Sequence, residues 1–542
     1  MQHGYVGLAG RVKAMLVSAC VVLYGCASVV NPTGGKKDIT PPVLTGSDPA
    51  SSTTNFTSEK IVLSFDEYVQ LKDVEKQLII SPIIKPAPIV SAKAKKVVVE
   101  IKADLSPNTT YTLNFGDAII DLRESNPIKD FRYVFSTGSV VDTMELAGKV
   151  FSAENLQAQS NILIMLYKTE DDSAPLKSTP GFFTRTDSSG NFRLRNISTG
   201  PYKLFALKDA DGDYKHNTPD ELIGYVQEPV SGSDSMPVTI YLFKETEKKL
   251  TLRNGKFENK ASCSMVFNRS VRNVTFTDLS GSTQWKNLEF NTGGDTVIVW
   301  LKDTLVDSLR IQLSENGVPL DTVNFIQSVK SERNAIAPLK MIVSSRSGTN
   351  PLPGKPIVVQ TTLPVQSFDE NLISLTHDSI TPVAFTVEMA DTLKRTFKII
   401  APTVEKKGYT LKFLPGAFKS DYGKNNDTTI IALRTPMLTE FGSVKVKLSG
   451  LTEGNYLLQV VSDKDEIKYE KKLSDNGNYL FENIVPAIYK LRLVNDKDAN
   501  GMFTTGDYIK KQQPEKVKYY TETINIRANW DIEVDWNAGA DN

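Results

Sequence analysis

One part of this 542-residue chain repeats another, and this constrains its fold more than any other feature. The segment Ser188-Ser-Gly-Asn-Phe-Arg-Leu-Arg-Asn-Ile197 aligns without a gap with Asp475-Asn-Gly-Asn-Tyr-Leu-Phe-Glu-Asn-Ile484, at an offset of 287 residues. The same offset places Tyr202-Lys203-Leu204 on Tyr489-Lys490-Leu491. Copies within one chain indicate a modular architecture, in which each copy forms a unit of similar structure.

A second, weaker correspondence pairs Tyr111-Thr-Leu-Asn-Phe115 with Tyr409-Thr-Leu-Lys-Phe413. The two correspondences predict the order module A, module B, a middle module, a degenerate A and a second B. Domains of about 100 to 200 residues would divide this length into three to five units. We therefore expect modules over residues 43–138, 139–244, 245–348, 349–437 and 438–542.

The local patterns after residue 43 are those of β-strands. Short segments rich in β-branched and aromatic residues are bounded by turn residues, as in Lys60–Phe65, Lys96–Ile101, Thr110–Phe115 and Thr296–Leu301. We find no long stripe of apolar residues at helical spacing. The sequence therefore predicts an all-β protein, a tandem array of β-sandwich domains.

Composition excludes several classes of function. The 63 basic and 63 acidic side chains leave no net charge to attract a polyanion, so nucleic acid is not an expected partner. Three cysteines and three histidines are too few for a disulfide framework, a multi-cysteine zinc site or an iron–sulfur cluster. No HExxH, GxSxG or Rossmann motif is present. We expect no enzyme, and we expect His216 and His377 to be surface histidines.

The N-terminus has the pattern of an export signal. Arg11 and Lys13 precede the apolar run 14–24, which is too short to span a bilayer and fits a signal peptide over residues 1–25. The junction before Cys26 resembles a bacterial lipobox, which implies a diacylglyceryl and palmitate anchor on that cysteine. Cys20 fits the pattern as an alternative, with a shorter apolar run. Residues 26–42 would then be a lipidated, flexible tether.

The first module resembles a known family. Ile61-Val-Leu-Ser-Phe-Asp-Glu-Tyr-Val69, Leu105-Ser-Pro-Asn-Thr-Thr-Tyr-Thr-Leu113 and Phe135-Ser-Thr-Gly138 are similar to the bacterial Ig-like domain first named from S-layer proteins. With the tether Pro32-Thr-Gly-Gly-Lys-Lys-Asp38, the resemblance is to Ig-like lipoproteins of Bacteroidota envelopes. It implies an Ig-like sandwich over 43–138, a degenerate copy over 349–437, and an outer-membrane location facing either the surface or the periplasm.

The B modules resemble a different group of sandwiches. Gly190-Asn-Phe192 and Gly200-Pro-Tyr-Lys-Leu204 are similar to prealbumin-like or carboxypeptidase-regulatory-like domains, although Ala487-Ile488 replaces Gly200-Pro201 in the second copy. The resemblance implies prealbumin-like sandwiches over 139–244 and 438–542. Such modules imply spacing and binding, and bring no catalytic residues.

One constellation has the spacing of metal ligands. Acidic and amide residues recur at relative positions 1, 3, 5 and 12 of a loop in each B module, and the first copy has a further amide at position 9. Calcium takes oxygen ligands from such alternate positions. The candidates are Asp209, Asp211, Asp213, Asn217 and Asp220, and in the second copy Asp496, Asp498, Asn500 and Asp507. Position 6 is Tyr214 in one copy and Gly501 in the other, and Glu221 is an alternative carboxylate in the first. The alternative to a calcium site is that both segments are acidic turns that bind no metal.

These observations predict a non-enzymatic outer-membrane lipoprotein that acts as a scaffold or interaction module. One form of this hypothesis is an accessory subunit of an outer-membrane β-barrel complex, with envelope proteins as partners. The alternatives are a cell-surface protein that binds carbohydrate or another polymer, and a divergent hydrolase. Exposed tryptophans would favour glycan binding, but strand alternation favours core packing for Trp300 and a place in the last sheet for Trp530 and Trp536.

Overall fold

A computed structural model describes residues 37–169, 171–232, 237–246, 249–279, 284–326, 335–344, 350–378 and 380–539. The predicted lipidation site Cys26, its alternative Cys20 and the predicted signal peptide lie outside these ranges. Of the described residues, 37–145 and 195–199 form one compact unit, and the remainder forms a second.

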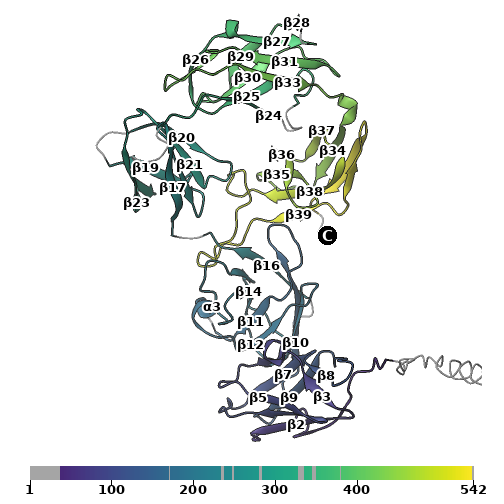
Figure 1. Cartoon of the computed structure of the whole chain (residues 1–542). Coiled ribbons are helices and arrows are strands. Elements are labelled where there is room, and N and C mark those ends of the chain that lie inside the picture. The colour runs from purple at the N-terminus through teal and green to yellow at the C-terminus, as the bar shows by residue number, and fades with distance from the viewer. Residues whose placement is uncertain are drawn as a thin grey trace, which may run out of the picture. The chain divides into compact units, whose positions relative to one another are not determined.

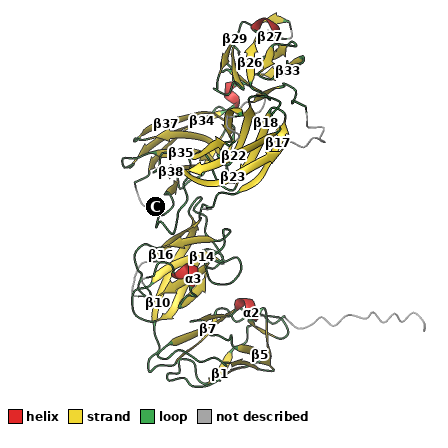
Figure 2. Cartoon of the chain, turned by 90° about the vertical axis from the view of Figure 1, so that its left-hand side faces the viewer, coloured by secondary structure: helices red, strands yellow, loops and turns green. Residues whose placement is uncertain are grey.

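The chain is all-β, as predicted. Within the described ranges, its short helical turns are α2 (Val74–Gln77), α3 (Ala174–Lys177), η3 (Glu370–Leu372) and η4 (Leu438–Glu440), among many strands (Figure 2). The four strands expected from sequence are confirmed as β2 (Lys60–Phe65), β6 (Lys96–Glu100), β7 (Thr110–Gly116) and β21 (Thr296–Leu301). Within the described ranges, no helix is both long and apolar enough to cross a bilayer.

The first module is a sandwich of two main sheets with strand orders β1-β2-β6-β5 and β4-β7-β9, plus the pair β3–β8 (Figure 1). Alternate residues of β2, such as Ile61 and Leu63, enter the core and meet Val97 and Val99 of β6. Its other strands are β1 (Leu44–Asp48), β3 (Val69–Leu71), β4 (Ile79–Ser81), β5 (Ile89–Lys93), β8 (Ile119–Asp121) and β9 (Phe131–Ser136).

The degenerate Ig-like module has the same strand order with one strand more, β28, at an edge of its second sheet. Its sheets follow the orders β24-β25-β30-β29 and β28-β27-β31-β33, with the pair β26–β32. Strand β24 lies before residue 349, the predicted start of this module, and joins its first sheet. The bounds are β24 (Met341–Ser344), β25 (Ile357–Thr361), β26 (Val365–Phe368), β27 (Ile373–His377), β28 (Thr381–Pro382), β29 (Thr386–Met389), β30 (Thr396–Ile400), β31 (Gly408–Phe413), β32 (Phe418–Ser420) and β33 (Thr429–Arg434).

One tyrosine in each of the two Ig-like modules makes an equivalent hydrogen bond. The hydroxyl of Tyr111 accepts the backbone N–H of Ser106 at 2.8 Å, and that of Tyr409 accepts the N–H of Val404 at 2.8 Å. This is the corner found in many Ig-like sandwiches, where a tyrosine ties its strand to the preceding loop. The weaker of the two sequence correspondences therefore extends to side-chain hydrogen bonds.

The two B modules also share a topology, in which the first and last strands pair in parallel. The first copy has the order β12-β11-β14-β15-β16-β10-β13, and the second has β37-β34-β41 and β36-β35-β38-β39, with β40 on β38. Strand β10 runs parallel to β16, and β34 runs parallel to β41. The bounds are β10 (Met144–Ser152), β11 (Leu163–Tyr167), β12 (Phe182–Arg185), β13 (Asn191–Ile197), β14 (Lys203–Lys208), β15 (Leu222–Tyr225), β16 (Val238–Lys244), β34 (Gly442–Ser449), β35 (Tyr456–Val461), β36 (Ile467–Leu473), β37 (Gly477–Ile484), β38 (Ala487–Asn495), β39 (Val517–Tyr519), β40 (Ile524–Ile526) and β41 (Asp531–Asn537).

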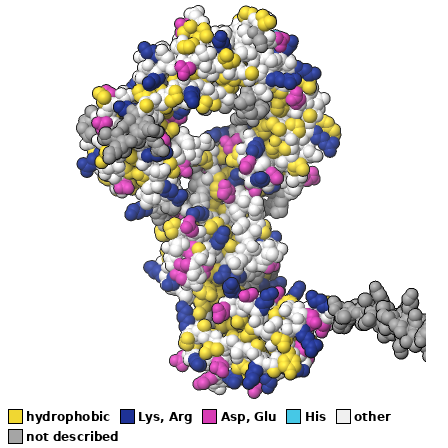
Figure 3. Space-filling model, viewed as in Figure 1, with side chains coloured by type: hydrophobic (Ala, Val, Ile, Leu, Met, Phe, Trp, Pro, Cys, Tyr) yellow, Lys and Arg dark blue, Asp and Glu magenta, His cyan; other side chains and the backbone are white. Residues whose placement is uncertain are grey.

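The middle module is a sandwich of the sheets β17-β18-β21-β20 and β19-β22-β23. Its core contains Cys263 and Met265, while Trp300 belongs to the core of the degenerate Ig-like module, which confirms its predicted core packing. The bounds are β17 (Leu252–Asn259), β18 (Ser262–Phe267), β19 (Val274–Asp278), β20 (Trp285–Phe290), β22 (Ser308–Glu315) and β23 (Val318–Ile326). Basic and acidic side chains are interspersed over the face seen in Figure 3, in keeping with the even charge balance.

Candidate functional site

The acidic loop of the first B module joins β14 to β15. Carboxylate oxygens of Asp209, Asp211 and Glu221 all lie within 4.8 Å of one another. Glu221 is 1% exposed and accepts the backbone N–H groups of Asn217 at 3.0 Å and Thr218 at 3.1 Å. The loop therefore folds around a buried glutamate and brings three acids together.

The equivalent loop of the second B module joins β38 to β39. Asp496, Asp498 and Glu515 form the corresponding carboxylate group, again within 4.8 Å. Glu515 accepts the N–H of Lys497 at 2.6 Å and that of Thr504 at 2.8 Å. Glu221 and Glu515 thus close their loops in the same way.

Two equivalent positions of each loop have the left-handed backbone conformation. Glycine occupies the first of these positions in the first loop and the second of them in the second loop. In the first loop φ is +81° at Gly212 and +66° at Tyr214, and in the second it is +56° at Ala499 and +77° at Gly501. The ring of Tyr214 packs on Phe183 with centroids 5.1 Å apart, which helps to hold the unfavourable conformation. The backbone path is therefore preserved although its glycines are not.

Burial and crowding of carboxylates raise pKa values in both loops. Burial raises the pKa of Asp209, and the neighbouring Glu221 raises it further. Burial likewise raises the pKa of Glu515, with added repulsion from Asp498 and Asp496. Calcium uses six to eight oxygens, so three carboxylates would supply part of a shell that needs carbonyl or water oxygens as well.

Not all of the predicted ligands join these groups. Asp213 accepts Asn217 Nδ2 at 2.6 Å, and Asn500 donates its Nδ2 to Asp498 at 3.0 Å, so these residues brace the loops. The side chain of Asp220 is 87% exposed and pairs with Lys244.

In the second copy, Asp507 pairs with Lys510 outside the carboxylate group. The alternative carboxylate Glu221 was foreseen, whereas Glu515 was not. Glu221 follows Asp209 by 12 residues and Glu515 follows Asp496 by 19, so the gap-free alignment misses it.

The second loop is seven residues longer than the first, and part of it contacts the first B module within the second compact unit. Tyr508 packs edge-on against Phe205 and Tyr225, with ring centroids 5.5 and 5.1 Å apart. Its backbone N–H donates to Glu245 at 2.6 Å, and its hydroxyl donates to the carbonyl of Asp172. The second acidic loop therefore carries the segment that docks onto the first B module.

The reciprocal contact uses the equivalent strand of the second B module. Arg492 of β38 stands at the repeat position of Phe205 in β14, and its guanidinium donates to the carbonyl of Glu154 at 2.8 Å. Beside it, Leu457 and Val494 form a cluster with Leu156 on the face of β35 and β38 opposite the main core. All six residues of β35 are consequently buried.

The cysteine and the two histidines of the described ranges are either buried or held beside acidic side chains. Cys263 is fully buried, which raises its pKa to about 12 and keeps it protonated. His377 contacts Asp378 at 2.8 Å in a β-hairpin turn. The expectation that His216 lies on the surface is wrong, because it is only 9% exposed. Its Nε2 lies 2.9 Å from Glu245, a carboxylate that also accepts the backbone N–H of Tyr508.

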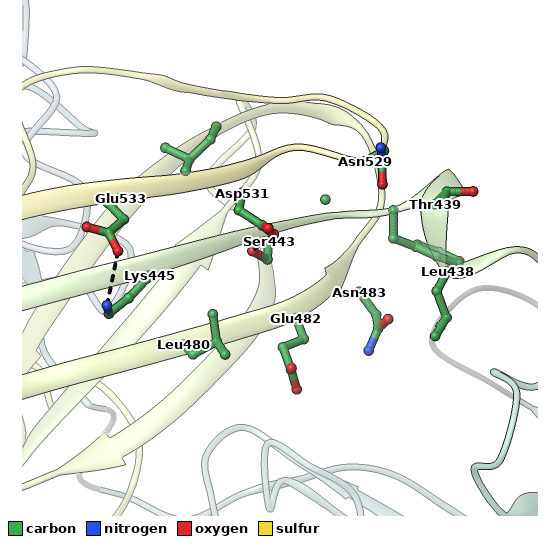
Figure 4. A pocket seen from close by; sticks show the side chains of 13 residues that line it. Leu438, Thr439, Ser443, Lys445, Leu480, Glu482, Asn483, Asn529, Asp531 and Glu533 are labelled. Atoms are coloured by element: carbon green, nitrogen blue, oxygen red, sulfur yellow. Dashed lines mark hydrogen bonds and ion pairs between the residues drawn. The ribbon is translucent and has the colours of Figure 1, made fainter.

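A hollow of about 490 Å³ lies over the sheet β37-β34-β41 (Figure 4). Lys445 and Glu533 pair across its floor at 3.0 Å, and Ser443 donates to Asp531 at 2.5 Å. Because these central groups satisfy one another, the hollow is the solvated outer face of the sheet. Nearby, Trp530 is 55% exposed beneath Arg527, whereas Trp536 of β41 is 4% exposed.

Comparison with known proteins identifies the first module. Residues 38–137 match the sequence family described as a bacterial Ig-like domain. No curated protein matches the chain significantly.

Several solved structures of tandem-domain proteins are similar to the chain at low identity. BcpA, the major pilin subunit of Bacillus cereus, is 10% identical with a TM-score of 0.14, over 73% of this chain and 99% of that one. The S-layer protein SbsC is 13% identical with a TM-score of 0.15, over 86% and 67%. The Bacillus anthracis TIE protein is 9% identical with a TM-score of 0.14, over 98% and 79%.

Proposed function

We propose that the chain is a non-enzymatic scaffold or interaction protein of the bacterial cell envelope, anchored in the outer membrane through Cys26. In its specific form, it is an accessory subunit of an outer-membrane β-barrel complex in a Bacteroidota-like bacterium. The observation that carries the proposal is the tandem array of sandwiches, which begins with a bacterial Ig-like domain. Arrays of this kind present loops and strand edges to other molecules.

The chemistry of the reactive side chains supports a non-enzymatic role. The Cys263 thiol is buried and protonated, and His216 is held between Glu221 and Glu245. A general base needs access to a substrate proton, which neither arrangement offers. A divergent hydrolase therefore has little support among the described residues.

We also propose that each acidic loop binds calcium weakly and thereby orders the B modules. Titration of the purified chain with calcium, followed by calorimetry and thermal denaturation, tests this. The substitutions Asp209→Asn and Asp496→Asn should each remove one binding event, while Asp220→Asn should remove none because that side chain is exposed and paired with Lys244. Equal binding by all variants would contradict the assignment.

The principal test of function is isolation of the tagged, membrane-extracted protein from its native envelope, with partners identified by mass spectrometry. A stoichiometric β-barrel partner supports the proposal, and protease treatment of intact cells reports which face the protein occupies. Radiolabelled palmitate should be incorporated by the parent and by Cys20→Ala but not by Cys26→Ala. Turnover on a panel of glycans or peptides would overturn the non-enzymatic assignment.

The second candidate is capture of carbohydrate or another polymer at the cell surface. The exposed ring of Trp530 is the observation that favours it, because aromatic faces stack on sugars. A glycan array probed with the parent and with Trp530→Ala distinguishes this function: binding lost in the variant supports it.

A further inference from the structure

The first Ig-like module exposes apolar side chains beside the point where the described chain begins. Ile39 is 79% exposed, Val43 59%, Tyr68 56% and Leu122 53%. They belong to the entering segment before β1, to the loop between β2 and β3 and to the loop after β8. Single exposed apolar residues are normal, but several that share one surface mark an interaction site.

Hydrogen bonds hold these three segments side by side. The N–H of Asp66 donates to the carbonyl of Val43 at 3.1 Å, and the N–H of Leu122 donates to that of Tyr68 at 3.0 Å. The side-chain amide of Asn126 donates to two backbone carbonyls of the entering segment, at 3.1 and 3.3 Å. The four exposed side chains named above therefore lie on one surface, which we call the entry patch.

The loop after β8 is fixed from within. Asp121 is 2% exposed, and its carboxylate accepts the backbone N–H groups of residues 123–126 at distances between 2.6 and 3.1 Å. Burial alone would raise the pKa of Asp121, but the four backbone donors lower it below its ordinary value. A partner would therefore meet an ordered surface, which reduces the entropy lost on binding.

The rim of the entry patch is acidic. The carboxylates of Asp38, Asp66, Glu67 and Glu124 border it, and none of them has an ion-pair partner among the residues that the structure describes. Burial raises the pKa of Glu67, and the negative charges of Asp121, Asp66, Asp38 and Glu124 raise it further. Negative charge without a partner beside an apolar surface attracts a molecule that is both cationic and apolar.

A lysine of the same module shows how this surface holds a cation. Lys95 Nζ donates to the backbone carbonyl of Asp66 at 2.6 Å and lies 6.0 Å from the centre of the Tyr68 ring. An ammonium group beside an aromatic face is stabilised by the ring quadrupole. Because this ammonium is bonded to a carbonyl, it leaves the carboxylates of the rim without a partner.

We propose that the entry patch docks a basic, amphipathic segment of an envelope protein. Apolar side chains of that segment would pack on Tyr68 and Leu122, while its lysine or arginine side chains would pair with the acidic rim. The inference rests on the proposed scaffold function and names the surface by which the first module would hold a partner.

Chain length and charge together favour a membrane protein as the occupant. The predicted lipidation site Cys26 precedes Asp38 by 12 residues, and 12 extended residues reach at most about 43 Å. The entry patch would therefore stay close to the membrane that holds the anchor. An acidic rim is repelled by anionic lipid headgroups, which favours a protein segment over the lipid surface itself.

The first test titrates the purified full chain with a fluorescent 12-residue peptide of alternating lysine and leucine. Binding should weaken at least tenfold in Glu67→Gln/Glu124→Gln, whose carboxylates make no hydrogen bond in the described structure, and at least tenfold in Tyr68→Ala. The matched control Glu59→Gln/Glu100→Gln removes the same charge at the opposite end of β2 and should bind within threefold of the parent. Equal binding by all variants would overturn the proposal.

The second test places a photo-cross-linking residue at Tyr68 of the chain in its native envelope. A cross-link to a segment of a membrane protein that combines lysine or arginine with apolar residues supports the proposal, provided that the same residue at Tyr241, exposed in the other compact unit, does not capture that segment. A cross-link to lipid, or to residues of this chain before position 37, would overturn it, as would the absence of any cross-link.

The two tests separate this inference from the proposed function. A β-barrel partner that is recovered equally by the parent, Tyr68→Ala and Glu67→Gln/Glu124→Gln would overturn docking at the entry patch and leave the scaffold function standing. Peptide binding that is lost in both patch variants, with no partner recovered from the envelope, would support the chemistry of the surface and count against the scaffold function.

Discussion

Replacing Tyr508 tests whether the second acidic loop holds the two B modules together. The side chain is 5% exposed and its ring fills the space between Phe205 and Tyr225. Truncation of a buried aromatic residue to alanine costs about 3 to 5 kcal/mol. Because Tyr508 belongs to the docking segment and not to the core of its own sheet, we expect Tyr508→Ala to loosen the contact and leave both modules folded.

Hydrogen–deuterium exchange of the full chain measures this loss directly. Residues 503–513 should exchange at least about 100-fold faster in Tyr508→Ala, since every 1.4 kcal/mol is a factor of ten. Tyr508→Phe keeps the ring but leaves the carbonyl of Asp172 without its donor, at a cost of about 1 to 3 kcal/mol, so its effect should be intermediate. The neighbouring Ile509→Ala is the control, because that side chain is 61% exposed.

An unchanged exchange rate in Tyr508→Ala, within about threefold of the parent, would refute this reasoning. It would mean that the backbone bond to Glu245 and the remaining contacts hold the segment without the ring. A loss of circular dichroism in the same variant would instead place Tyr508 in the core of a module.

Three further predictions concern the loops and the thiol. Both Ala499 and Gly212 have positive φ, so Ala499→Gly should stabilise the chain against denaturation by up to about 1 kcal/mol and Gly212→Ala should destabilise it by about 1 kcal/mol. An added Cβ at position 212 meets nothing within 4 Å, so backbone strain alone would cause the second effect. Effects of the same sign in the two variants would contradict this. The raised pKa values of Asp209 and Glu515 mean that the folded chain binds more protons than the unfolded chain, so stability without calcium should fall as pH rises from the ordinary carboxylate range through those raised values. Calcium should restore stability above that window and have no effect below it, and a calcium effect that is independent of pH would count against ligation by these acids. Cys263 should resist a thiol reagent at pH 8 until the chain unfolds, whereas rapid labelling of the native chain would show that the middle core opens.

The repeat and the short strands could be predicted from the sequence because they depend on local patterns. A β-strand buried on one face shows alternation within six residues, as in Lys60–Phe65, and this strand was predicted with its observed bounds. The carboxylates of Asp209 and Asp211 lie two residues apart on one turn, so their proximity also follows from local sequence.

The residue that completes the second acidic loop could not be found in this way. Glu515 lies beyond a seven-residue insertion, and an alignment at constant offset selects Asp507 in its place. Burial of His216 likewise depends on Glu245, which lies 29 residues away and is itself fixed by the N–H of Tyr508. Such positions are defined by partners that are distant in the chain.

The sequence alone determined the β-class, the order of the repeated modules and the acidic composition of two turns, because periodicity, repetition and turn chemistry act over a few residues. Tertiary structure decided which carboxylate completes the second acidic loop and which aromatic ring joins the modules. Glu515 lies beside Asp496 and Asp498 because the longer second loop returns to them, and Tyr508 meets Phe205 and Tyr225 of a different module. Such contacts depend on how whole strands and loops are arranged, and no single segment of the sequence records them.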